Sequence, residues 1–382
     1  MLMTDKKEKI RRLFNETFAD KARVAWFFSR VYRDDRAMLL EQDGAVLSSL
    51  MMRPYRFLFH DSELGLAFIH GVATARAARG HGYMSQLMTQ ALHEAADSGM
   101  AFAAVIPSAR SLYFFYDRFG FANAVYYDLQ RYTSVHAFPV SRRYEPCPVD
   151  YDGFARLERR MACTVLHSEE DYTYIIERFE LDHGTAAAVR DVENGGIAAM
   201  AFAVPRSGET HVVALYAVDR DAADNVLSLV HSNRPMAVHA FPETGREVIV
   251  EEDTATVEAQ NLPGAPIVEE PKPQQMICPE GREQLRPRAM LRIIDAMTVL
   301  TALAQAHPEL EQVIRLHDSI IPANNGVFIL RHGKCTRTDF TMRHLTLDVD
   351  IAVLTSLLFS SQRVGEVFSL PTVRPALPLM LD

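Results

Sequence analysis

The sequence has little cysteine, 1 tryptophan and no long apolar run. Its 4 cysteines, Cys147, Cys163, Cys278 and Cys335, are far apart and form no CxxC pair. This spacing argues against a disulfide framework or a zinc site and favours reduced thiols. Residues 1–9 lack the apolar core of a signal peptide, and no apolar stretch reaches membrane-spanning length. We therefore expect a cytoplasmic protein with no membrane partner.

Positive charge is not in excess either. The chain has 40 Lys and Arg against 49 Asp and Glu, a net charge of −9. This balance argues against a general nucleic-acid binder and mildly favours cationic partners. An apolar content of 48% and a charged content of 23% are ordinary for a globular protein. A length of 382 residues predicts two or three domains.

The stretch Gly71–Met88 carries the clearest motif. Before it, the apolar run Leu64–Ile69 predicts a buried strand, and after it the four-residue spacing from Tyr83 to Ala95 predicts a helix. The connecting loop is Arg79-Gly-His-Gly82. A helix start leaves backbone N–H groups unpaired, glycines admit a pyrophosphate, and the arginine adds charge. The spacing matches neither a Walker A loop nor a dinucleotide fingerprint.

This pattern resembles motif A of the GNAT acetyltransferases. Val72-Ala-Thr74 is followed by Arg79-Gly-His-Gly-Tyr-Met84, and Tyr116-Asp-Arg-Phe-Gly120 resembles the second GNAT signature. The chain departs from the pattern at Arg76, where proline is common, and at Ala109, where asparagine is common. The resemblance implies acetyl-CoA binding by Val72, Ala73, Thr74, Arg79, Gly80, His81, Gly82, Tyr83 and Met84.

Three regions follow one another along the chain, and the expected fold class is α/β (α+β). Residues 1–135 have the GNAT order of elements and predict an acetyl-CoA-binding domain. Residues 140–270 repeat that style without a glycine loop and predict a GNAT-like domain lacking the pyrophosphate loop. Residues 275–382 are similar to a sterol-carrier-like domain of mixed helices and strands.

Four local predictions accompany this division. Residues Ala122–Leu129 form the strand that closes the first sheet. Proline and charge between Leu262 and Gln275 predict a linker or extended crossover. Apolar spacing from Ala289 to Ala306 predicts one long amphipathic helix. Ile320-Ile321 predicts a short strand.

The order of the three regions, with Arg288-Ala-Met-Leu-Arg-Ile-Ile-Asp295, resembles the enhanced-intracellular-survival (Eis-like) N-acetyltransferases. That resemblance implies acetyl-CoA as co-substrate, no metal, and direct transfer to a primary amine in a ternary complex. The acceptor is then a small-molecule amine, such as a polyamine or aminoglycoside, or a lysine. Eis-like proteins are often homo-oligomers, although no feature of this sequence sets the number of subunits.

Acetyl transfer needs a base for the amine, a donor for the thioester oxygen and an acid for the leaving thiolate. The resemblance places the donor among the backbone N–H groups of Val72–Thr74, the acid at Tyr116 and the base at the terminal carboxylate of Asp382. Two alternatives stay open. Tyr116 can instead pack against Leu112 and Phe119 with its hydroxyl bound to backbone, and Asp382 can be a frayed chain end.

Other features have a plain structural explanation. Trp26-Phe-Phe28 can wall an acceptor pocket but is more often core, and His167 with Glu169 and Glu170 is better explained as a helix start than as a metal cluster. Two competing functions remain: a CoA-sensing or apolar-ligand-binding protein that uses the sterol-carrier-like domain, and an assembly scaffold.

Overall fold

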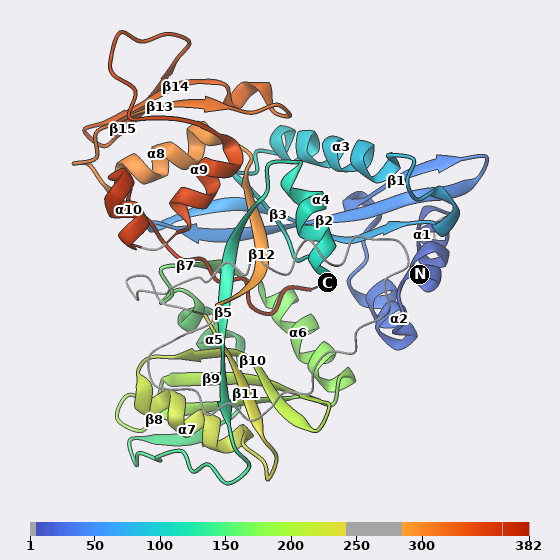
Figure 1. The fold of residues 1–382 in the computed structure, drawn as a ribbon. Helices are drawn as coiled ribbons and strands as arrows, with labels where there is room; N and C mark the ends of the chain where they lie inside the picture. Colours follow the sequence, from blue (N-terminus) through green and yellow to red (C-terminus); the bar gives the residue numbers. More distant parts are fainter. Residues whose placement is uncertain (1–4, 242–284, 361, 382) are drawn as a thin grey trace, which may run out of the picture.

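A computed structural model describes residues 5–241, 285–360 and 362–381 (Figure 1). The predicted linker Leu262–Gln275 and the terminal Asp382 lie outside the described residues. The first part contains α1 (Asp5–Thr17), α2 (Lys21–Arg30), β1 (Ala37–Gln42), β2 (Ala45–Phe59), β3 (Ser62–Thr74), α3 (Tyr83–Asp97), β4 (Phe102–Val105), α4 (Arg110–Asp117) and β5 (Ala122–Tyr132).

Two further parts complete the chain. The second contains β6 (Tyr144–Cys147), α5 (Tyr151–Glu158), β7 (Cys163–Leu166), α6 (Glu169–Leu181), β8 (Thr185–Asp191), β9 (Ile197–Arg206), β10 (Glu209–Ala217), α7 (Arg220–Val230) and β11 (Met236–Ala240). The third contains β12 (Arg286–Ile293), α8 (Ala296–Ala306), β13 (Gln312–His317), β14 (Gly326–Arg331), β15 (Lys334–Thr338), β16 (Leu347–Asp350), α9 (Ile351–Leu358) and α10 (Gln362–Phe368). None of these described helices is long and apolar enough to cross a membrane.

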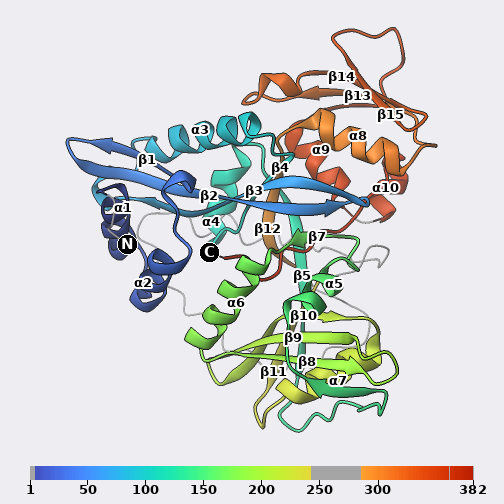
Figure 2. The ribbon, with the colours of Figure 1, turned by 180° about the vertical axis from the view of Figure 1, so that it is seen from behind.

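One 12-stranded sheet runs through the first two parts and includes β12 of the third (Figures 1 and 2). Its order is β1-β2-β3-β4-β12-β5-β11-β10-β9-β8-β6, and β7 pairs with the far end of β2. The third part adds a 4-stranded sheet with the order β15-β14-β13-β16. This mixture of helices and strands confirms the expected α/β class.

The order of elements occurs twice along the long sheet. In the first part, two helices precede the antiparallel strands β1, β2 and β3, and α3 then leads to β4, parallel to β3. In the second part, α5 and α6 precede the antiparallel strands β8, β9 and β10, and α7 leads to β11, parallel to β10. Strand β5 joins the two halves because it pairs with both β12 and β11.

Strand β12 corrects two of the predictions. Residues Ala289–Ala306 do not form one helix: the chain runs as a strand to Ile293, and the Asp295 carboxylate then caps α8 by accepting the Thr298 N–H at 3.1 Å. Strand Ala122–Leu129 does not close the first sheet either, because β12 lies between it and β4. Residues 289–294 are all buried. A strand buried on both faces reads as a continuous apolar run, so its periodicity resembles that of a buried helix.

Arg292 fixes β12 in the first part. Its fully buried guanidinium bonds both carboxylate oxygens of Asp318 at 2.8 Å and also donates to the carbonyl of Phe119. A Cβ at Gly120, where φ is +75°, would lie 2.0 Å from Arg292 Nη1. Gly120 of the tyrosine signature is therefore needed for the approach of this side chain.

The third part packs its helices against the long sheet. Val299 and Leu303 of α8 and Leu354 of α9 share one buried cluster with Phe57 and Phe102. The expected strand Ile320-Ile321 is wrong, because these residues form a bend whose N–H groups bond Asp318 at 2.9 and 3.0 Å. The resemblance of residues 275–382 to a sterol-carrier-like domain stays a prediction.

Candidate active site

The loop that leads into α3 presents an open helix start. Gly80 and Gly82 have φ values of +82° and +80°, and a Cβ at either position would meet nothing within 4 Å. Gly82 is the N-cap of α3, and no side chain caps it. The N–H groups of the first turn therefore face open space, with a partial positive charge that favours an anion.

The two charged side chains of the loop have different positions. Arg79 is exposed, and its Nε lies 3.4 Å from the Thr74 carbonyl. It makes no ion pair with a described carboxylate, so its guanidinium is available to an anion above the loop. His81 Nδ1 lies 2.9 Å from the Arg79 carbonyl, and its ring stacks near Tyr83, which makes His81 a loop-shaping residue. Met84 is half-buried at the start of α3.

Strands β3 and β4 separate just before this loop. They pair in parallel only where Leu66–Phe68 meet Phe102–Ala104, while β3 continues to Thr74. At Gly71, with φ +59°, the pairing of β3 with β2 shifts by one residue. A glycine inside a strand pattern is a signal for such a bulge. The β4-facing edge at Val72–Thr74 therefore has no strand partner among the described residues and can meet an extended ligand chain.

The predicted cofactor residues after the bulge have distinct environments. Val72 and Thr74 are half-buried, and Ala73 is buried. The Thr74 hydroxyl lies 3.0 Å from the hydroxyl of Ser48 on β2, which leaves its side chain facing away from the open edge. Backbone groups, rather than side chains, are thus what this segment offers to a ligand.

Tyr116 of α4 packs against β3 and α3, the strand and the helix that flank the loop. Its side chain is 4% exposed and belongs to one cluster with Ala67 and Ile69 of β3 and Met88 of α3. Burial raises the pKa of Tyr116 to about 12. Its hydroxyl has no hydrogen-bond partner among the described residues. The alternative in which Tyr116 only packs, with its hydroxyl bound to a backbone carbonyl, therefore lacks that carbonyl there. The hydroxyl stays protonated at neutral pH and can donate.

The end of the chain runs into the first part. Leu379 and Leu381 are buried in one cluster with Phe27 of α2 and Ala73 of β3. Arg178 of α6 donates to the Met380 carbonyl at 2.9 Å. The buried residues before the chain end thus contact α2 and α6; Figures 1 and 2 show both helices near this segment. The described residues before Asp382 thus approach the β3 side of the candidate site.

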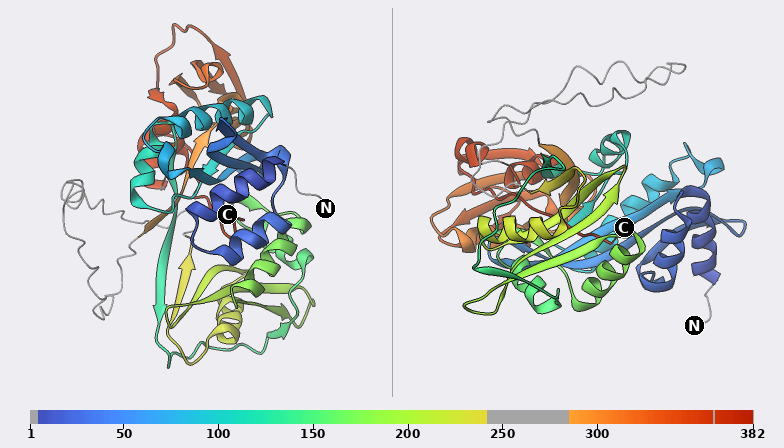
Figure 3. Two further views of the ribbon diagram at one scale, coloured as in Figure 1. Left: turned by 90° about the vertical axis from the view of Figure 1, so that its right-hand side faces the viewer. Right: turned by 90° about the horizontal axis from the view of Figure 1, so that it is seen from below.

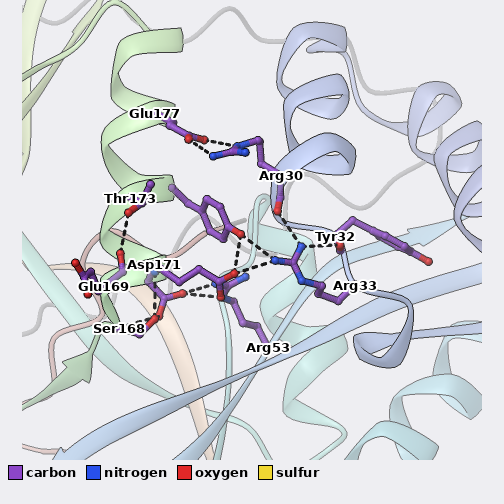
Figure 4. Close-up of polar contacts among 11 residues, drawn as sticks. Arg30, Tyr32, Arg33, Arg53, Ser168, Glu169, Asp171, Thr173 and Glu177 are labelled. Carbon is purple, nitrogen blue, oxygen red and sulfur yellow. Dashed lines mark hydrogen bonds and ion pairs between the residues drawn. The ribbon is translucent and has the colours of Figure 1, made fainter. Parts of the chain in front are cut away.

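Helix α2 is held from the second part by α6 (Figure 4). Arg30 makes an ion pair with Glu177, and Arg33 bonds Glu170 at 2.8 Å. Arg53 of β2 forms a buried ion pair with Asp171. Figure 3 shows the same arrangement from the side, with α1, α2 and α6 on one face of the molecule. The position of α2 beside the candidate site therefore depends on α6.

The aromatic stripe on α2 serves the core. Phe27 and Phe28 are buried with Phe14 of α1, and Trp26 is half-buried. The Phe27 ring contacts His70, the residue before the Gly71 bulge, with ring centres 5.7 Å apart. The stripe therefore supports the strand that carries the site.

The helix start at residues 168–171 explains the acidic cluster beside His167. Ser168 and Asp171 form a capping box, with bonds of 3.1 and 2.9 Å between side chains and backbone N–H groups. His167 is buried and bonds Glu158 at 2.6 Å. Among residues 5–241 and the described parts beyond them, no group of three metal-ligating side chains occurs.

Comparisons with known proteins agree with this geometry. Residues 2–124 match the family described as Acetyltransferase (GNAT) domain. No curated protein matches the chain. Among solved structures, a conserved protein of unknown function from Enterococcus faecalis, titled a probable N-acyltransferase, is similar with a TM-score of 0.74 at 16% identity, covering 99% of this chain and 97% of its own.

Two further structures are similar over nearly their whole length. Eis1 from Mycobacterium abscessus has a TM-score of 0.68 at 16% identity, covering 98% of this chain and 92% of its own. A GCN5-related N-acetyltransferase from Anabaena variabilis has a TM-score of 0.68 at 14% identity, covering 97% and 95%. At these identities the likeness shows a shared fold. With the family match over residues 2–124, the chain carries a GNAT acetyltransferase domain and is a GNAT-type acyltransferase.

Proposed function

We propose that the protein is an acetyl-CoA-dependent N-acetyltransferase that transfers acetyl to a primary amine by direct attack in a ternary complex. One observation carries the proposal: the uncapped start of α3 adjoins the separated strands β3 and β4, and the buried Tyr116 side chain packs in one cluster with residues of both strands. Its cytoplasmic location and an oligomeric state stay predictions.

The binding residues fit an anionic, extended co-substrate. The N–H groups from Gly80 to Met84 and the Arg79 guanidinium hold the pyrophosphate. The free edge of β3 lies along the extended arm, and N–H groups of Val72–Thr74 donate to the thioester oxygen as it gains charge. Open space at both glycines is the feature of this structure that supports the fit.

Two protons must move during the transfer. An alkyl amine has a pKa of ~10.4 and attacks only after losing its proton. We assign the base to the terminal carboxylate of Asp382, supported by the buried path of Leu379 and Leu381 toward β3. As the new C–N bond forms and the C–S bond breaks, Tyr116 gives its proton to the leaving thiolate.

The apolar-ligand alternative requires a cavity that such a ligand could fill. A cavity of about 680 Å³ lies between the β2–β3 turn and the chain after α10. His60 and His307 line it, together with Asp61 and Glu309. Leu310, Leu370, Pro371 and Val373 line it as well. The walls therefore combine ionisable and apolar side chains, and they do not exclude an apolar ligand.

The test is release of free CoA thiol from acetyl-CoA over a panel of amines. Tyr116→Phe keeps the ring and should lower kcat by about 10²- to 10⁴-fold, because only the proton donor is lost. Tyr113→Phe is the matched control: its hydroxyl bonds the Pro287 carbonyl at 3.3 Å, one turn earlier on α4. This variant should retain kcat to within about 3-fold, since its lost bond is not to the reacting atoms.

The outcomes separate the acid from the activity. Unchanged release by Tyr116→Phe would keep the enzyme and remove Tyr116 as its acid. No release with any amine, despite measurable binding of acetyl-CoA, would contradict the proposed function and favour a CoA-sensing protein.

A further inference from the structure

Two arginines at the start of β12, Arg286 and Arg288, lie near α4, the helix that carries Tyr113 and Tyr116. Met290 of β12 pairs with Val105, the last residue of β4, and the strands are antiparallel. Arg286 and Arg288 therefore lie beyond the end of β4, where β3 and β4 have separated. The hydroxyl of Tyr113, one turn before Tyr116, donates to the Pro287 carbonyl between them.

Two more arginines approach the same region from α2 and α6. Arg178 donates to the carbonyl of Met380, next to the chain end. Arg23 of α2 bonds Asp182 at 2.7 Å, and Arg178 lies 4.0 Å from the same carboxylate. Positive charge from both helices is thus held around a single acidic group.

Arg206, at the end of β9, connects these two sets. Arg206 is an exposed residue. Partial desolvation by the surrounding protein, and then the charges of Arg288, Arg23 and Arg178, lower its pKa, which Asp182 opposes. These groups from four elements are therefore near enough to repel one another.

An aromatic and imidazole surface lies against the arginines. The ring of His239 on β11 stacks on Tyr127 of β5 with centres 4.8 Å apart, and its Nε2 lies 3.3 Å from His211 Nδ1. Burial, followed by the charges of His211, Arg288, Arg206 and Arg286, lowers the pKa of His239 to about 4. His239 is therefore neutral near pH 7 and adds no charge of its own.

Carboxylates do not balance these arginines among the described residues. Asp182 is paired with Arg23, and Glu209 accepts two bonds from Arg131 at 2.8 and 3.0 Å. Arg206, Arg286 and Arg288 have no carboxylate partner in the described ranges. Among the described residues, which do not include Asp382, the acceptor side of the site is therefore locally positive, although the whole chain carries −9. Like charges gathered in this way are relieved by a bound anion.

We infer that the acceptor is an amine that also carries an anionic group, a carboxylate or a phosphate, bound by Arg206 and Arg288. The inference rests on the proposed function and names its substrate class. It differs from the polyamine or aminoglycoside that the Eis-like resemblance implies, with which the net charge of −9 agrees. Guanidinium groups match both anions because they offer paired N–H donors in a fixed plane. The primary amine of the same molecule then faces the thioester.

The test compares amines that differ by one anionic group. The pairs are tyrosine with tyramine, lysine with cadaverine, and O-phosphoethanolamine with ethanolamine, each measured by thiol release at saturating acetyl-CoA. The anionic member of at least one pair should have the higher kcat/KM, by about 10- to 100-fold. The two amino-acid pairs report a carboxylate, and the third reports a phosphate.

Variants then attribute the preference to the arginines. Arg206→Gln and Arg288→Gln should each lower the ratio of kcat/KM within the preferred pair by about 10-fold, and Arg288→Glu should reverse the preference. Arg220→Gln, on a side chain that is 93% exposed at the start of α7, is the control and should retain the wild-type ratio.

The outcomes distinguish failure of this inference from failure of the proposed acetyltransferase function on which it rests. Equal or better use of the non-anionic amines by the wild-type enzyme would overturn the inference and leave the acetyltransferase intact. A preference that survives in both glutamine variants would also overturn it. Failure of every amine, anionic or not, would contradict the proposed function itself and the inference with it.

Discussion

The two halves of the long sheet contain the same strand–helix–strand unit, but the N-terminus of its helix is uncapped in one half and capped in the other. In each half, a strand leads through a helix to a parallel neighbour: β3–α3–β4 and β10–α7–β11. Helix α3 begins after Gly82 with no capping side chain. Helix α7 begins after Asp219, whose carboxylate accepts the Ala222 N–H at 2.8 Å and a bond from the Tyr144 hydroxyl.

If the start of α3 holds the pyrophosphate, as we propose, the difference shows what such a site needs beyond topology. Both helices have the partial positive charge of an N-terminus. In the second half, the protein's own carboxylate occupies that position, which stabilises α7 and excludes a second anion. In the first half, glycine leaves the position empty and Arg79 stands beside it. The second half instead serves the first through α6, which holds α2.

The largest expected effect concerns the link between the halves. Asp171→Asn should lower the free energy of unfolding by about 3 kcal/mol, because it leaves the buried Arg53 guanidinium without its counter-charge. Glu177→Gln, on the same helix, is the control. Its ion pair with Arg30 is partly exposed, and its loss should cost no more than about 1 kcal/mol. Denaturant unfolding measures both, and equal losses would contradict this role for the buried pair.

The same pair predicts a pH dependence. Burial raises the pKa of Asp171, but the Arg53 charge and the bonds from Ser168 outweigh it, so the net pKa is lowered. A lowered pKa contributes stability that is fully present above the unfolded value of ~3.9 and is lost as pH falls through the folded value below it. Asp171→Asn should therefore flatten the acid limb of the stability curve, and an unchanged acid limb would contradict this.

The next largest effect should follow from adding a capping side chain at the N-terminus of α3. Gly82→Asp places a carboxylate where α7 has one, and the Kd for acetyl-CoA should rise by about 100-fold through competition for the N–H groups and repulsion of phosphate. Gly99→Asp is the matched control. It lies just beyond the other end of α3, also has a positive φ, +72°, and meets nothing within 4 Å. Equal loss of binding in both variants would show that strain, not the cap, is responsible.

The smallest effect should come from removing the capping side chain at the N-terminus of α7. Asp219→Ala should cost about 1 kcal/mol of stability as its N-cap bond is lost, and should gain no binding of acetyl-CoA, because no glycine loop precedes α7. Asp150→Ala removes the equivalent bond to Gly153 at the start of α5 and should cost a similar amount. Titration with acetyl-CoA checks the binding, and binding by Asp219→Ala would contradict the need for glycine.

Local signals in the sequence predicted the helices and the loop of the candidate site that lie on contiguous segments. Glycine positions, apolar spacing and charge in Arg79–Met84 are features of neighbouring residues, and the loop and α3 follow from them. Helix α4 was likewise predicted from neighbouring residues, those of the signature Tyr116-Asp-Arg-Phe-Gly120. These elements were predictable because their geometry depends on the residues beside them.

Features made by distant segments could not be predicted in this way. Strand β12 lies beside β4 because Arg292 meets Phe119 and Asp318, which are far from it along the chain. Its apolar run has no period that distinguishes it from a helix. The positive surface at Arg206 and Arg288 is likewise hidden in a net charge averaged over the whole sequence.

The most direct test of the account is amide hydrogen exchange of the full-length protein with and without acetyl-CoA. The account predicts slower exchange at Gly80–Ser85, where the uncapped N–H groups of α3 would bond the pyrophosphate, and no change at Arg220–Asp224 of α7. Protection at the start of α7, or none at either helix under saturating acetyl-CoA, would contradict the central claim that an open, glycine-lined helix start forms the acetyl-CoA site.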